Sequence, residues 1–161
     1  MREAVYKILN DMDIKYEVIE HPAVFTVEEA DGLELDVYGK GTKNLFLRDE
    51  KKQNFYIVVL CNEKRADLKD MRAKLDSKPL SFASEELLFE FLKLTRGAVT
   101  PFGVINDIEH KVMVVFDGDI FKFNKVGEHP NDNRATLFLD PYDLKRVIEK
   151  LGNETRVIEI L

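Results

Sequence analysis

The stretch Ile57-Val58-Val59-Leu60-Cys61 decides the fold of this 161-residue chain. It is apolar throughout and rich in β-branched residues, which is typical of a central strand covered on both faces. Two strand-like runs, Asn44 to Arg48 and Asn54 to Leu60, flank the polar turn Asp49 to Gln53. The sequence therefore predicts a β-hairpin that anchors a sheet.

Further helices and strands are predicted on both sides of this hairpin. Thr26 and Glu29 have the form of a capping box, Ser84 and Asp140 are helix caps, and Gly152 is a helix stop. The predicted helices contain Val5 to Met12, Val27 to about Leu33, Asp67 to Leu75, Ser84 to Leu94, and the segment from Pro141 to Gly152. The predicted strands are Tyr16 to Ile19, Leu80 to Phe82, Val112 to Phe116, Ile120 to Val126, Ala135 to Leu139 and Arg156 to Ile160.

Asp117-Gly118-Asp119 is a strong tight-turn signal between two of these strands, so this part of the chain is expected to be an antiparallel meander. No internal repeat, linker or low-complexity tract interrupts residues 1–161. We therefore expect a single domain of the α+β (mixed α/β) class. Its sheet should be mixed, largely antiparallel and barrel-like, with helices around it.

The charge balance argues against a general nucleic-acid binder. Lys and Arg number 24 against 30 Asp and Glu, a net charge of −6, whereas neutralising phosphates requires an excess of basic residues. Any RNA contact must be local, and basic residues do concentrate between Lys40 and Lys78. A solvated mixed surface is the more common explanation of such a stretch.

The N-terminus lacks the features of a signal peptide, and no apolar run reaches about 18 residues. A soluble, cytoplasmic protein without a membrane segment is expected. The single cysteine, Cys61, ends the buried run and is most simply a core residue. The three histidines lie too far apart in sequence for a local ligand pattern, so neither a metal nor another cofactor is predicted.

Lys43 and Asn44 form the first candidate site, because they directly precede the apolar residues of the first hairpin strand. A partly dehydrated ammonium there could bind a phosphate or carboxyl-type oxygen, and the amide could offer a donor and an acceptor. Local sequence alone favours a solvated lysine at the end of a strand.

The second candidate is the loop Arg96 to Gly103. Gly97 and Gly103 permit close backbone approach, so successive N–H groups could face a carbonyl oxygen, and Thr100 could supply a hydroxyl. The loop leads into Val104-Ile105, a short strand-like segment. An ordinary helix-to-strand turn is the simpler interpretation.

The third candidate is the polar loop His129 to Asn133. His129 could act as a base, a hydrogen-bond partner or a structural cap, and a lone loop histidine is more often structural. Asn133 could hold the loop by bonding to the backbone.

Taken together, four segments strongly resemble the YbaK and prolyl-tRNA synthetase-associated editing family, in order and spacing along nearly the whole chain. They are Lys43 to Asp49, Leu80 to Glu86, Gly97 to Asp107 and His129 to Asn133. Within the family they look like the ProX (PrdX-like) branch, whose members are free-standing deacylases for alanine on proline tRNA. The resemblance implies a mixed, barrel-like sheet with helices around it.

The resemblance also implies the site. The expected catalytic residues are Lys43, Asn44, Gly97, Thr100 and Pro101, and the expected substrate-binding residues are Thr26, Ala98, Val99, Phe102, Gly103, Asn106, His129 and Asn133. The expected partners are the acceptor end of mischarged tRNA(Pro) and prolyl-tRNA synthetase. In this family the ribose hydroxyl of the substrate is thought to help activate water, which would account for the lack of an evident base.

Two alternatives stay open. One is a deacylase for cysteine or another small amino acid on tRNA(Pro). The other, from a different class, is a non-catalytic protein that senses aminoacyl-tRNA or a free amino acid in the same pocket.

Overall fold

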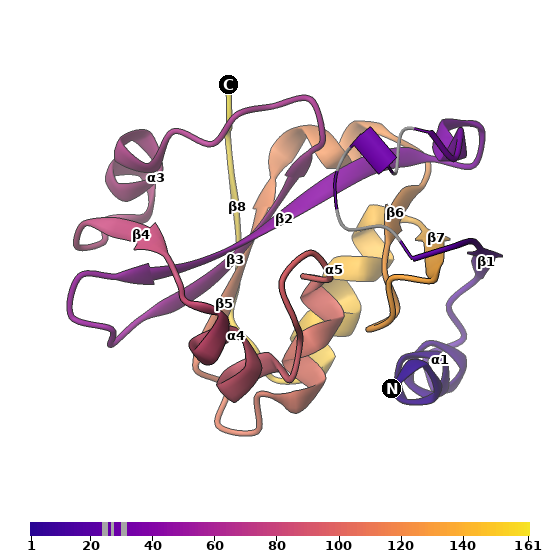
Figure 1. The fold of residues 1–161 in the computed structure, drawn as a ribbon, viewed down its shortest axis with the longest axis horizontal. Coiled ribbons are helices and arrows are strands. Elements are labelled where there is room, and N and C mark those ends of the chain that lie inside the picture. Colours follow the sequence, from indigo (N-terminus) through magenta and orange to yellow (C-terminus); the bar gives the residue numbers. More distant parts are fainter. Residues whose placement is uncertain (24–25, 27, 30–31) are drawn as a thin grey trace.

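Figure 1 shows the fold in a computed structural model, which describes residues 1–23, 26, 28–29 and 32–161. Its α helices are α1 (Arg2–Asp11), α3 (Leu68–Leu75), α4 (Glu85–Leu92) and α5 (Pro141–Lys150). Its 3-10 helices are η1 (Leu35–Val37), η2 (Pro101–Asn106) and η3 (Gly118–Lys122). Its strands are β1 (Tyr16–Glu20), β2 (Lys40–Asp49), β3 (Phe55–Cys61), β4 (Leu80–Phe82), β5 (Val112–Asp117), β6 (Val126–Glu128), β7 (Ala135–Leu139) and β8 (Thr155–Ile158).

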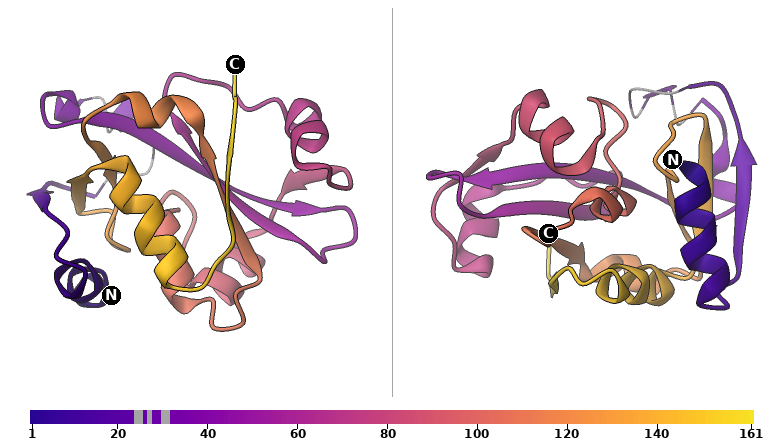
Figure 2. Two further views of the ribbon diagram at one scale, coloured as in Figure 1. Left: turned by 180° about the vertical axis from the view of Figure 1, so that it is seen from behind. Right: turned by 90° about the horizontal axis from the view of Figure 1, so that it is seen from below.

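In the part of the chain that the structure describes, the strands form one eight-stranded sheet in the order β1-β7-β6-β2-β3-β5-β8, with β4 added to β2. Within the described residues, β2 pairs antiparallel with β3 and β4, as β7 does with β1 and β6. The pairs β2–β6, β3–β5 and β5–β8 are parallel. Figure 2 shows α5 lying across one face and α1 beside the β1–β7 end. The predicted mixed sheet with flanking helices is confirmed.

The strand β3 is buried along its whole length, as its apolar sequence predicts. Ile57 and Val59 lie in a core cluster with residues of α1, α4 and α5, while Val58 and Leu60 lie in a second cluster with residues of α3. Because helices cover both faces, every side chain of the strand leaves water, and this burial stabilises the sheet. The predicted hairpin is confirmed, since β2 pairs with β3 from Thr42 to Arg48.

The predicted antiparallel meander is wrong for β5 and β6, whereas the antiparallel pairing of β6 with β7 is confirmed. β5 is paired in parallel on both edges, with β3 on one side and β8 on the other, so it has no free edge for a hairpin partner. The Asp117 side chain accepts a hydrogen bond from the amide of Asp119 and caps η3. Ile120 is buried on this 3-10 helix, and the following strand is only Val126–Glu128.

The predicted strand-like segment Val104-Ile105 is also wrong, because both residues belong to η2. Thr100 caps η2 through its hydroxyl, and Pro101 occupies the first turn, where a missing N–H costs nothing. The caps predicted at Ser84 and Asp140 are confirmed, and Gly152 ends α5 with a positive φ of 100°.

The helix predicted from Val27 to about Leu33 falls partly outside the described residues. Glu28 and Glu29 are helical, and the amide of Glu29 donates to Oγ1 of Thr26 at 3.1 Å, as the capping box predicts. In the described part of the chain, no helix combines the length and apolar character that crossing a membrane requires.

Candidate functional site

A pocket of about 840 Å³ lies at the N-terminal part of β2, where this strand stops pairing with β6 and begins to pair with β3. Lys40 and Gly41 pair in parallel with β6, whereas Thr42 onwards pairs antiparallel with β3. Side chains from both pairings meet at this junction. The lining residues are Thr26, Leu35, Asp36, Gly39, Lys40, Gly41, Thr42, Lys43, Asn44, Asn62, Glu63, Gly97, Val99, Gly127, Glu128, His129, Thr136 and Phe138.

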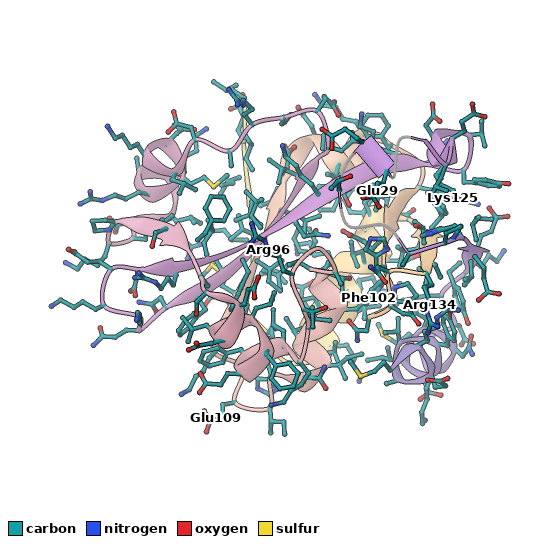
Figure 3. All side chains as sticks on the ribbon, in the orientation of Figure 1. Glu29, Arg96, Phe102, Glu109, Lys125 and Arg134 are labelled. Atoms are coloured by element: carbon teal, nitrogen blue, oxygen red, sulfur yellow. The ribbon has the colours of Figure 1, made fainter. Side chains whose placement is uncertain are left out.

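Glycines allow the strands and the neighbouring ring to approach closely in this pocket. A Cβ on Gly39 would lie 2.8 Å from Cδ1 of Phe138 and 2.9 Å from the carbonyl oxygen of Lys125. A Cβ on Gly127 would lie 2.8 Å from Cε1 of Phe138. Lys125, labelled in Figure 3, accepts a backbone hydrogen bond from Lys40 at 2.8 Å, which fixes this approach.

Lys43 lies within β2, opposite Leu60, and its side chain is half-buried in the pocket lining. Within the described ranges it forms no ion pair with a carboxylate. The neighbouring Lys40 differs, because its ammonium lies 2.8 Å from the carboxylate of Glu63. The positive charge of Lys43 is therefore available to an anionic or oxygen-bearing ligand.

Asn44 connects three segments of the site. Its Nδ2 donates to the carbonyl oxygen of Val99 at 3.0 Å and to Oε1 of Glu128 at 2.8 Å. Glu128 is only 3% exposed, and burial raises the pKa of its carboxyl group to about 8, while the polar side chains of Asn44 and Thr42 act in the opposite direction. At neutral pH this carboxyl group is mostly protonated and uncharged.

The loop from Gly97 to Pro101 lies against the other side of the pocket. Gly97 has a φ of 84°, a conformation that favours glycine, and it lines the pocket with Val99. Thr100 is fully buried, and its hydroxyl donates to the carbonyl oxygen of His129 at 2.7 Å. The threonine hydroxyl thus joins this loop to the His129 segment.

His129 lines the pocket, and a contact with the main chain holds its ring in place. Its Nδ1 lies 2.9 Å from the carbonyl oxygen of Ala135, and its ring is 6.3 Å from that of His21. Burial lowers the pKa of His129. His21 is held in turn by Thr136, whose hydroxyl lies 2.8 Å from Nε2.

The structure thus brings six of the sequence-predicted site residues to one pocket: Thr26, Lys43, Asn44, Gly97, Val99 and His129. The other predicted residues are not among the lining residues of the pocket in the described structure. Phe102, which Figure 3 labels, is fully buried, Ala98 and Pro101 are also buried, and Gly103 packs against Leu94. Asn106 donates to the carbonyl oxygen of Leu92, and Asn133 does not line the pocket in the described part of the structure.

Sequence reasoning missed several lining residues, above all Glu128. The available signal was an acidic residue next to His129, followed by a polar loop, but no local pattern distinguishes it from a surface acid. Asp36 and Asn62 were missed for the same reason, since they reach the pocket only through tertiary packing.

Other catalytic chemistries find little support among the described residues. They contain no group of three or more His, Cys, Asp or Glu side chains that could hold a metal ion. Cys61 is a core residue, as predicted, and burial raises the pKa of its thiol to about 11. A thiol with so little thiolate at neutral pH is a poor nucleophile.

Comparison with known proteins places this pocket in a family. The sequence model of a protein family, the aminoacyl-tRNA editing domain, matches residues 21–147. These residues contain every lining residue of the pocket. The chain belongs to the aminoacyl-tRNA editing domain family. Its enzymatic activity is that of an aminoacyl-tRNA deacylase.

Relatives of this editing domain match along nearly its whole length. It is 43% identical over 159 residues to the prolyl-tRNA editing protein ProX of Acetoanaerobium sticklandii, covering 99% of this chain and 97% of that one. It is 33% identical to the prolyl-tRNA synthetase associated domain-containing protein 1 of Xenopus laevis, covering 98% and 96%. A crystal structure of the hypothetical protein APE2540 has the same fold, with a TM-score of 0.77, 20% identity and 97% coverage of both chains.

Proposed function

We propose that this chain is a free-standing, single-domain editing deacylase that acts in trans on mischarged tRNA(Pro), with alanyl-tRNA(Pro) as its main substrate. The observation that carries the proposal is the pocket in which the half-buried Lys43 lies beside Asn44 and the Gly97 loop. The name of the 43% identical relative, a prolyl-tRNA editing protein, supports the choice of tRNA. We place the activity in the cytoplasm.

The reaction requires few catalytic groups from the protein, because an aminoacyl ester is already activated. A positioned water and stabilisation of charge at the carbonyl are sufficient, and no covalent nucleophile is needed. In our proposal Lys43 engages the ester or the terminal adenosine, and the N–H groups of the Gly97 to Pro101 loop orient the carbonyl. The ribose hydroxyl of the substrate helps to activate the water.

The remaining predicted residues take supporting roles in this proposal. Thr26, Val99 and His129 contact the substrate from the pocket lining. Ala98, Phe102, Gly103, Asn106 and Asn133 act from behind it, by holding the two loops that present the lining. Thr100 belongs with them, since its hydroxyl bonds to the carbonyl of His129.

The volume of the pocket bears on amino-acid choice. About 840 Å³ is far more than an alanyl group fills, and is typical of a pocket for a drug-sized ligand. The pocket therefore has room for the terminal nucleoside as well, and exclusion of proline has to occur in one part of it. Cysteine or another small amino acid would satisfy the same volume.

Aromatic side chains beside the pocket suit the unpaired 3′ end of a tRNA. The ammonium of Lys40 lies 5.3 Å from the ring centroid of Phe123, which is 40% exposed. Tyr38 is 39% exposed and packs against Phe138 in the pocket wall. Exposed rings next to a lysine are a common platform for stacking single-stranded bases. Prolyl-tRNA synthetase is a further proposed partner, as the source of the mischarged tRNA.

The proposal is tested by deacylation of alanyl-, cysteinyl- and seryl-tRNA(Pro) by the wild type, Lys43→Ala and Lys111→Ala. Lys111 is the matched control, because it is an exposed lysine that pairs with Glu109 and does not line the pocket. We expect hydrolysis of alanyl-tRNA(Pro) by the wild type and by Lys111→Ala, and a loss of roughly 100-fold or more in Lys43→Ala.

Hydrolysis of none of the mischarged tRNAs by the wild type would refute the enzyme assignment and favour a non-catalytic sensor. Much faster release of cysteine than of alanine would shift the substrate to cysteinyl-tRNA(Pro).

A further inference from the structure

Two side-chain oxygens in the pocket wall have no hydrogen-bond partner among the described residues. Four such side-chain atoms are buried in the described part of the chain: Asn44 Oδ1, Glu128 Oε2, Asn131 Oδ1 and Asn153 Oδ1. Only the first two belong to residues that line the pocket. An unpaired buried polar atom is costly, so its presence in a binding pocket indicates a ligand group that completes it.

The two oxygens lie on residues that hold each other in place. Asn44 Nδ2 uses both of its hydrogens, one on Glu128 Oε1 and one on the carbonyl of Val99. This leaves Asn44 Oδ1 and Glu128 Oε2 as the two oxygens of this pair for which the described structure shows no partner, and both can accept a hydrogen bond once Glu128 is ionised. The main chain behind them is tied as well, since Thr42 Oγ1 donates to the carbonyl of Gly127 at 2.9 Å.

An amide oxygen and an ionised carboxyl oxygen on two hydrogen-bonded side chains suit a ligand group that carries several N–H donors and a positive charge. We propose that Glu128, together with the side-chain oxygen of Asn44, forms the subsite for the α-ammonium group of the aminoacyl substrate. This inference rests on the proposed function, because that function supplies a substrate with such a group. It assigns Glu128 to substrate binding and adds an amino-group contact to Asn44.

Binding is coupled to a proton. In the free pocket at neutral pH Glu128 holds a proton, because burial raises its pKa to about 8. Since Oε1 accepts from Asn44, this proton makes Oε2 a donor, and its loss turns Oε2 into an acceptor. When an ammonium binds, the carboxyl group gives its proton to solvent and the resulting carboxylate pairs with the ammonium. Other charged or titratable groups in the lining are Asp36, Lys40, Lys43, Glu63 and His129, and Lys40 is already paired with Glu63.

The subsite also bears on the rejection of proline. A primary ammonium has three N–H donors and rotates freely, so two of them meet both oxygens in a range of poses. The secondary ammonium of proline has two N–H donors, and its ring fixes their directions. Contact with both oxygens therefore favours alanine over proline without any difference in pocket volume.

The test uses two probes that cannot be hydrolysed as esters: 3′-alanylamino-3′-deoxyadenosine and its propanoyl counterpart, which lacks the amino group. Binding of each to the full chain is measured by isothermal titration calorimetry between pH 6 and pH 8.5, for the wild type and Glu128→Gln. Glutamine keeps the shape of the side chain and an acceptor for Asn44, but places a donor or a neutral oxygen where the carboxylate would form.

We expect the wild type to bind the alanyl probe roughly 10- to 100-fold more tightly than the propanoyl probe near pH 8. This preference should weaken as the pH falls towards 6, and about one proton should be released per alanyl probe bound at pH 7. Glu128→Gln should lose the preference and the proton release, and should bind the propanoyl probe as the wild type does.

Equal affinity of the wild type for the two probes would overturn the inference, as would a preference that survives unchanged in Glu128→Gln. If that variant does not fold, the wild type still tests the inference through its preference for the alanyl probe and the number of protons released on binding. Deacylation of alanyl-tRNA(Pro) without any probe preference would refute the subsite and leave the proposed function standing. A probe preference without deacylation of any mischarged tRNA would support the subsite and refute the proposed function.

Discussion

Asn44 and Glu128 lie 84 residues apart in the sequence, yet Nδ2 of the amide is 2.8 Å from Oε1 of the carboxyl group. The same nitrogen bonds to the carbonyl oxygen of Val99. One side chain of β2 therefore holds β6 and the Gly97 loop at the distance that defines the pocket.

Replacement of Asn44 by alanine should break both links. The carbonyl of Val99 and the carboxyl of Glu128 would lose a buried donor, so the free energy of unfolding should fall by about 1–3 kcal/mol. We also expect kcat/KM for alanyl-tRNA(Pro) to fall roughly 10- to 100-fold, because the loop is no longer positioned. Chemical denaturation and deacylation assays measure the two effects.

Asn54→Ala is the matched control for this substitution. Asn54 Nδ2 donates to the carboxylate of Asp49 at 2.8 Å in the turn between β2 and β3, away from the pocket lining. It should lower stability without lowering activity. Unchanged activity in Asn44→Ala would show that the link has no role in the site.

The unfolding free energy should depend on pH through Glu128. Its pKa is about 8 in the folded protein against an ordinary 4.5, so the folded state binds the proton more tightly. The stabilisation is fully present below about pH 4.5 and is lost as the pH rises towards 8, with a slope of up to about 1.4 kcal/mol per pH unit.

The measurement is a difference between two proteins. Subtracting the pH profile of Glu128→Gln from that of the wild type cancels His129, whose lowered pKa contributes with the opposite sign. We expect a difference that falls steadily from pH 5 to pH 8. A flat difference curve would mean that Glu128 is ionised in the folded protein throughout this range.

Alanine at Gly39 should damage the protein more than alanine at Gly41, although both residues line the pocket. A Cβ at Gly39 would lie 2.9 Å from the backbone oxygen of Lys125, which cannot move without shifting the strand. A Cβ at Gly41 meets the end of the Asn62 side chain at 2.7 Å, and that side chain can rotate away.

Thermal unfolding of the two glycine variants tests this difference. We expect Gly39→Ala to be destabilised by about 1–3 kcal/mol and Gly41→Ala by less. The reverse order would indicate that Asn62 is held more rigidly than the backbone at Lys125.

The tRNA-docking surface gives a fourth prediction. Lys51 and Lys52 lie in the turn at the far end of β2 from the pocket, just past Asp49, which is about 20 Å from Lys43 at the usual rise along a strand. If the acceptor stem lies along β2, reversing both charges should weaken tRNA affinity and flatten its dependence on salt.

Affinity for tRNA(Pro) is measured at several salt concentrations, with Lys111→Glu as the control on another part of the surface. An affinity that responds neither to salt nor to the double reversal would place the tRNA on a different face.

Much of this architecture could be predicted from the sequence, because it depends on short-range chemistry. The apolar run from Ile57 to Cys61 has no polar residue to present to water, so it has to be covered on both faces. Ser84 and Asp140 cap helices through hydrogen bonds to amides two or three residues away. Such contacts are encoded within a few residues.

The segment from Ile120 to Val126 shows the limit of local reasoning. Its composition fits a strand, and Asp117-Gly118-Asp119 fits a turn. The parallel pairing of β5 on both edges excluded a hairpin, and the Asp117 carboxylate then capped a 3-10 helix. Pairing between distant strands overrode a local preference.

The site, like the fold, has one part that the local sequence predicts and another part that depends on contacts between distant segments. The sequence by itself determined that Lys43 and Asn44 are adjacent at the start of an apolar strand, and that a glycine-bearing loop and a histidine loop exist. Only the tertiary structure decided that Glu128 joins them, because the parallel pairing of Gly41 with Gly127 places β6 beside β2. Burial in that junction then raises the pKa of an acid that local sequence cannot distinguish from a surface residue.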